Sequence, residues 1–279
     1  MVFKYKAYKT LLDELGRLDY IFETTHLAIL EFKSLMDASE NPKSFLKEKS
    51  KKYGIVVNYD PKNNLDNLTV LGQIANVYHY VETYLYELKD EYNLYEEDAE
   101  KKLDLSRIPS KDETKLQKIL NLLTKINRIN KVDFIPEYLL DIFNYYYLLR
   151  VYFSHKSTIK ESDLKASYNK AVKHYKDKTG LPRKFQKFDA PNEVNNLKFN
   201  DFFLFTNVSK DLSLILSSLL YPNPTGFAKL EFLVLKTGVL NKPNRKEKFI
   251  NNHLITNFGY ICEDDSDKRD FTDIIAKSL

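Results

Sequence analysis

The chain has 279 residues, with 43 lysines and arginines against 39 aspartates and glutamates and a pI near 8.7. This length can bury a large core, and the mild excess of positive charge is compatible with nucleic-acid binding without requiring it. The single cysteine, Cys262, excludes an internal disulfide and a cysteine-rich zinc site, and it favours a reducing compartment.

Glycine and proline are scarce, and Val and Ile do not gather in alternating runs. Long stretches rich in Leu, Lys, Glu and Tyr at helical spacing predict an all-α fold, a helical bundle. The N-terminal residues carry charges where the apolar part of a signal peptide would lie, and no later run has the length of a membrane span. We therefore expect a cytoplasmic protein with no membrane partner.

The first part of the chain contains two long amphipathic segments. Apolar residues recur at helical spacing over 4–37 and again over 68–94, which predicts a helix in each range. Asn41 and Pro42 end the first helix, and a lysine-rich piece over 43–54 follows. Such a charge run is typical of a solvated helix, and phosphate contact is the alternative.

Two further helices are predicted next. Ser110 to Glu113 has the pattern of a capping box, and the apolar spacing over 116–129 fits the helix that it would start. Asp133 is then a candidate N-cap and Pro136 suits the first turn of a helix. The segment 136–154 is apolar almost all round, so we expect it to be a buried helix at the centre of the bundle.

The last part of the chain mixes helices with less regular segments. A basic amphipathic helix is predicted over 162–178, an apolar helix over 199–220, and another helix over 225–240. We expect a helical bundle over 1–220 and a C-terminal extension over 221–279, with short strands as one option for the extension.

Two chemically capable side chains lie near the end of the buried helix, Arg150 and, five residues later, His155. A buried guanidinium needs a partner or a task. An arginine, four intervening residues and a histidine near the end of a buried helix resembles the signature of the HEPN ribonucleases. Many members of that family have a polar residue directly after the arginine, whereas this chain has Val151.

The resemblance implies an endoribonuclease that acts without a metal or another cofactor, with Arg150 and His155 as catalytic residues. It also implies a homodimer, because in that family the motifs of two domains meet in one composite cleft. Such enzymes serve as toxins or antiphage effectors, so an antitoxin or another defence-system protein is an expected partner.

Elementary chemistry agrees with these roles. RNA can be cleaved by its own 2′-hydroxyl group, and an imidazole can give or take a proton while a guanidinium matches the charged phosphate oxygens. An offset of five residues places two side chains about 140° apart on an ideal helix. One copy would therefore aim Arg150 and His155 at one phosphate only if the helix ended near Ser154.

Basic residues beyond this pair are candidates for RNA binding. Lys156 directly follows His155, and the stretch that starts at Arg183 combines cations with phenylalanines, a composition that can hold single-stranded RNA by phosphate contact and base stacking. The candidates are Lys156, Arg183, Lys184 and Lys187.

Other enzyme classes leave no trace in the sequence. It has no glycine-rich phosphate loop, nucleophile elbow or His-Glu-x-x-His motif, and His79, Glu82 and Glu87 are too loosely placed for a metal site. The alternative to a nuclease is a non-catalytic helical protein that binds or inhibits a partner. In that case Arg150 would pair with a carboxylate such as Glu82 or Glu87, and His155 would be an ordinary surface residue.

Overall fold

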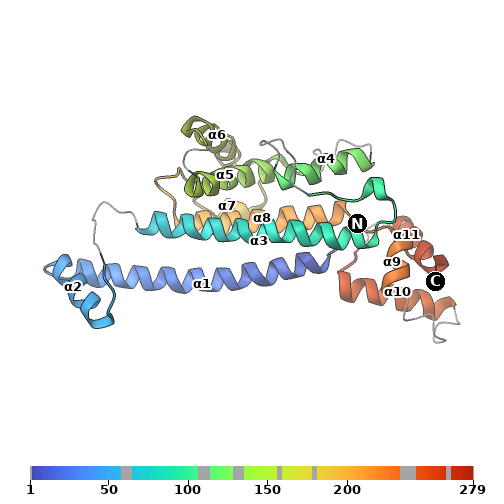
Figure 1. The fold of residues 1–279 in the computed structure, drawn as a ribbon, viewed down its shortest axis with the longest axis horizontal. Helices are drawn as coiled ribbons and strands as arrows, with labels where there is room; N and C mark the ends of the chain where they lie inside the picture. Colours follow the sequence, from blue (N-terminus) through green and yellow to red (C-terminus); the bar gives the residue numbers. More distant parts are fainter. Residues whose placement is uncertain are drawn as a thin grey trace. The chain divides into compact units, whose positions relative to one another are not determined.

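The computed structural model is all-α, as predicted, and its elements are labelled in Figure 1. In the described part of the chain the only β-type pairing is one isolated antiparallel bridge between Val2 and Ile261. The described residues are 2–57, 65–105, 114–127, 135–155, 159–177, 181–232, 243–261 and 265–278. The helices are α1 (Lys6–Asp37), α2 (Pro42–Tyr53), α3 (Leu65–Tyr95), the 3₁₀ turn η1 (Ala99–Lys101), α4 (Lys115–Asn127), α5 (Glu137–Ser154), α6 (Glu161–Asp177), α7 (Arg183–Gln186), α8 (Phe199–Leu219), α9 (Pro224–Glu231), α10 (Pro243–Phe258) and α11 (Asp265–Ser278).

The predicted long helices are confirmed, with ends that differ by a few residues, and the lysine-rich piece is the largely exposed helix α2. The helix predicted over 225–240 is shorter, because α9 ends at Glu231. In the described part of the C-terminal extension, the regular structure beyond the single bridge is helical. The capping box at Ser110 to Glu113, Asp133 and Cys262 lie outside the described residues. Thr114 caps α4 instead, because its hydroxyl accepts a hydrogen bond of 3.1 Å from the main-chain N–H of Gln117.

The chain forms two compact units, and both are assembled from separate stretches of sequence. One unit comprises Met1–Asp13, Tyr78–Phe143 and Asn207–Leu279, and the other comprises Glu14–Val77 and Asn144–Thr206. The predicted boundary at residue 220 stays a prediction.

In the first unit, aromatic side chains build the core. Phe227 of α9 contacts Phe3, Tyr95 and Phe258, with ring centroids 5.9, 5.0 and 5.1 Å apart. Gly226 beside it has no room for a side chain, because a Cβ atom there would lie 2.1 Å from the carbonyl oxygen of Tyr95. This glycine therefore lets α9 approach the end of α3. Helix α11 contacts both α9 and α10 (Figure 1).

Polar groups in the same unit fix the start of α1. The carboxylate of Glu91 accepts hydrogen bonds of 3.0 Å from the main-chain N–H groups of Lys6 and Ala7, which have no acceptor within their own helix. A negative charge at a helix N-terminus is favourable, so Glu91 anchors this end of α1. Burial raises the pKa of Glu91, and the two N–H donors oppose that rise.

The second unit has its own aromatic core. Phe22 of α1 packs against Phe199 and Phe202 of α8, and His26 stacks on Phe199 with ring centroids 4.2 Å apart. Tyr146 of α5 packs against Phe205 of α8 at 5.0 Å. Since His26 lies flat against the half-buried ring of Phe199, its position has a packing explanation.

Candidate functional site

Arg150, near the end of α5, and His155, directly after it, belong to the second unit, which takes in the chain from Asn144 to Thr206. Most side chains of α5 are buried or half-buried, but Glu137, Asn144 and the last residues, Phe153 and Ser154, are exposed. The prediction that this helix has no solvated face is thus wrong at its C-terminal end. The chain becomes exposed where the sequence changes from Leu and Tyr to Phe153, Ser154 and His155.

Arg150 and His155 are positioned differently by this helix end. Arg150 lies on the penultimate turn of α5 and is half-buried. The helix ends at Ser154, and the main-chain N–H of His155 still donates a hydrogen bond of 2.7 Å to the carbonyl of Val151. The side chain of His155 is exposed. His155 therefore stands one residue beyond the helix, tied to it by that main-chain hydrogen bond and with its imidazole in solvent.

The predicted RNA-binding cations lie partly within the described residues. Arg183 and Lys184 are exposed on α7, and Lys187 is exposed just after it, whereas Lys156 lies outside the described residues. Phe185, between these cations, is fully buried, and its carbonyl accepts a hydrogen bond from the hydroxyl of Tyr175. Stacking of a base on Phe185 is therefore wrong as an expectation, and phosphate contact by the cations stays a prediction.

A buried carboxylate that sequence reasoning missed lies in the same unit. Asp201 of α8 is fully buried and accepts hydrogen bonds from the hydroxyl of Tyr146, the main-chain and side-chain N–H groups of Asn192, and the main-chain N–H of Lys198, at 2.8 to 3.0 Å. We call these four residues the Asp201 network. Burial raises the pKa of Asp201, and the donors oppose the rise.

The Asp201 network has a structural role: it holds the start of α8 in place. Asp201 reaches back to the main chain just before α8, as an acidic residue in the first turn of a helix commonly does. The signal in the sequence was the acidic side chain at the third position of a strongly apolar helix. What it could not show was that Tyr146 supplies a donor from another helix.

A second polar cluster, in the first unit, joins α3, α9 and α10. The hydroxyl of Tyr95 donates to Glu231 at 2.8 Å, and the Nε2 atom of His253 lies 3.3 Å from the same carboxylate. The side-chain amide of Asn257 lies 2.9 Å from the Nδ1 atom of His253, within hydrogen-bond distance. The ring of His253 also packs on Phe232, with centroids 5.0 Å apart. Each polar atom of this histidine has a partner, which is typical of a structural residue.

Other sequence candidates have partners as well. Glu82, which the non-catalytic alternative would pair with Arg150, forms an ion pair of 2.6 Å with Lys115. Among the described residues, no three His, Cys, Asp or Glu side chains converge as a metal site would need.

Comparison of the chain with family models, curated proteins and solved structures gives no match. Within the described residues, no single helix is long and apolar enough to cross a bilayer; α8 and α9 pass that test only as a pair, bent by 98°.

Proposed function

We propose that this protein is a metal-independent endoribonuclease in which Arg150 and His155 act on the RNA backbone. The observation that carries the proposal is the end of α5 at Ser154. A continuous helix would hold the two side chains on different faces, about 140° apart. With the helix ended, the exposed imidazole of His155 is released from that constraint while Arg150 stays on the last turns.

The two side chains have complementary tasks in this reaction. His155 takes the proton from the 2′-hydroxyl group, or returns one to the leaving 5′-oxygen, and its exposure gives a polynucleotide access to the ring. Arg150 donates hydrogen bonds to the phosphate oxygens as negative charge grows on them. The 2′-oxygen forms a bond to phosphorus as the bond to the 5′-oxygen breaks, so the product ends in a 2′,3′-cyclic phosphate.

Because one histidine supplies one proton role at a time, we propose a homodimer that brings two such helix ends to one cleft. The exposed cations Arg183, Lys184 and Lys187 belong to the same unit as the pair and would hold the phosphates of single-stranded RNA. A toxin or antiphage effector in the cytoplasm is the cellular role that this activity fits. A monomer in light scattering that still cleaves RNA would contradict the dimer.

The test is cleavage of labelled single-stranded RNA in EDTA by wild type, His155→Ala and His79→Ala. His79 is an exposed histidine of α3 outside the proposed site, so it is a matched control. Loss of the proton-transfer group should lower the cleavage rate by about a hundredfold or more, and His79→Ala should cut like wild type. Mass spectrometry of the 3′ ends should show the cyclic phosphate.

Arg150→Ala is a second, less clean variant, because Arg150 is half-buried and its loss can also lower stability. Thermal melts of all variants separate the two effects. If folded His155→Ala cuts RNA as fast as wild type, or if wild type is inert, the protein is instead a non-catalytic helical protein that binds a partner.

A further inference from the structure

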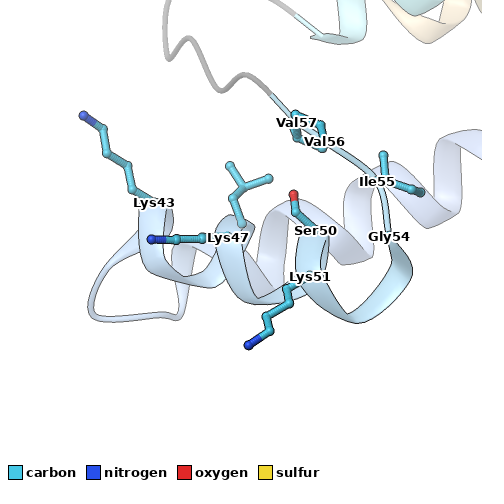
Figure 2. A pocket seen from close by; sticks show the side chains of 9 residues that line it. Lys43, Lys47, Ser50, Lys51, Gly54, Ile55, Val56 and Val57 are labelled. Atoms are coloured by element: carbon cyan, nitrogen blue, oxygen red, sulfur yellow. The ribbon is translucent and has the colours of Figure 1, made fainter.

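A concave pocket lies beside helix α2, in the second unit and on elements that the proposed ribonuclease site does not use. Its volume is about 640 Å³, within the range of protein sites that bind ligands. Figure 2 shows Lys43, Lys47 and Lys51 fanning out from α2, away from the extended residues Ile55, Val56 and Val57. We call this the α2 pocket.

The local sequence explains the shape of the pocket. Asn41 caps the start of α2 by accepting a hydrogen bond of 3.1 Å from the main-chain N–H of Ser44. Gly54 ends the helix with a φ angle of 67°, a left-handed conformation that glycine adopts without strain. The chain then runs back alongside the helix, so Leu46 lies in the pocket between the helix and residues 55–57.

One edge of the α2 pocket is a row of positive charge. Lys43, Lys47 and Lys51 are spaced four residues apart, which puts them on one side of the helix with a rise of roughly 6 Å between neighbours. No acidic residue lines the pocket. Within the described residues none of the three lysines forms an ion pair.

The other edge is apolar and open to solvent. The side chains of Ile55 and Val56 are 60% and 90% exposed, and Val57 beside them is 48% exposed. Exposed aliphatic side chains next to one another are unfavourable in water, and covering them is favourable by about 25 cal/mol for each Å².

We propose that the α2 pocket binds an acidic amphipathic segment of a partner protein. Glutamates at every fourth position of a helix repeat at the same roughly 6 Å as the lysines and can pair with them in a row. Leucines on the adjoining stripe of that helix would cover Ile55, Val56 and Val57. The lysines and the apolar edge of the α2 pocket thus both match an anionic helix with one apolar stripe.

Two other polyanions fit the pocket less well. Single-stranded nucleic acid needs aromatic faces on which bases can stack, and the lining side chains are aliphatic or lysine apart from Ser50 and Gly54. Anchoring on an anionic membrane needs a wide apolar face, whereas the exposed apolar edge here is three short aliphatic side chains, Ile55, Val56 and Val57.

The experiment measures binding of the full chain to a synthetic helical peptide with glutamate at every fourth position and leucine on the adjoining stripe. Wild type is compared with the triple variant Lys43→Glu, Lys47→Glu, Lys51→Glu. The matched control is the triple variant Lys165→Glu, Lys170→Glu, Lys173→Glu, which makes the same charge change at exposed positions of α6. A single-stranded RNA and phosphatidylserine vesicles are tested in parallel.

We expect the α2 triple variant to weaken peptide binding at least about tenfold, and the α6 variant to change it by less than about twofold. Val56→Ser, at a position that is already solvent-exposed, should weaken binding about threefold to fivefold without affecting folding. The proposal is overturned if the peptide does not bind wild type or binds the α2 variant equally well. Binding of only RNA or only vesicles that is lost in the α2 variant would overturn it in favour of that partner.

Discussion

Two polar centres lie on or next to helix α5, and they differ in burial and in hydrogen-bond partners. Tyr146 donates to the fully buried Asp201, where each oxygen of the carboxylate has donors and burial raises the pKa. His155, two turns later, stands beyond the last helical residue with its side chain in solvent. A buried polar group whose partners are all in place holds the fold together, whereas an exposed one at a helix end is available to a substrate.

The largest expected effect is that of Asp201→Ala on stability. It leaves the donors from Tyr146, Asn192 and Lys198 without their acceptor in a buried place, which should cost about 3 to 4 kcal/mol. Urea unfolding measures this loss. His155→Ala should change the free energy of unfolding by less than about 0.5 kcal/mol, because the side chain is exposed. Equal losses of unfolding free energy in Asp201→Ala and His155→Ala would contradict the view that Asp201 is structural and His155 is not.

Tyr146→Phe should have a smaller effect. It removes one hydrogen bond of 2.8 Å and leaves Asp201 with its main-chain and amide donors, so we expect a loss of about 1 kcal/mol in urea unfolding. The ring still packs on Phe205. A loss as large as that of Asp201→Ala would mean that the ring, not the hydroxyl, carries the contribution.

The pH dependence of stability should show the smallest, but most specific, signature. The folded-state pKa of Asp201 lies above its ordinary value of 3.8, so between these two values the unfolded chain has lost the proton that the folded chain keeps. Stability from this group is therefore fully present below pH 3.8 and falls as pH rises through the folded-state pKa.

Asp201→Asn supplies the control for that signature, because its side chain does not titrate. We expect the stability of wild type relative to Asp201→Asn to decrease as pH rises from about 3.8, in urea unfolding at a series of pH values. Glu91, whose pKa is also raised by burial, is present in both proteins, so its contribution cancels. A relative stability that rises with pH would mean that the network lowers the pKa of Asp201.

The sequence predicted the long helices because their apolar spacing is a local property. It also placed the end of α5 near Ser154, where helix-forming residues give way to Ser and His. It did not reveal the Asp201 network, because the partners lie 55 and 9 residues from Asp201 and an isolated aspartate carries no mark of burial. Base stacking on Phe185 was a wrong expectation for the same reason. Whether an aromatic residue in a basic stretch faces outward depends on packing that only the fold defines.

The pairing of Val2 with Ile261 has a consequence for synthesis of the chain. The two residues exchange main-chain hydrogen bonds of 2.7 and 3.1 Å, and Lys4 donates to the carbonyl of Phe258 at 2.8 Å. Residues 2 and 4 thus find these main-chain partners only after the segment around residues 258–261 has been translated. Phe3, fully buried in the finished fold, also packs on Phe227 and Phe258, so this part of its cover is missing until those residues are made. Residues 2–5 of the nascent chain are therefore a segment that chaperones should bind and that slow translation should expose to aggregation.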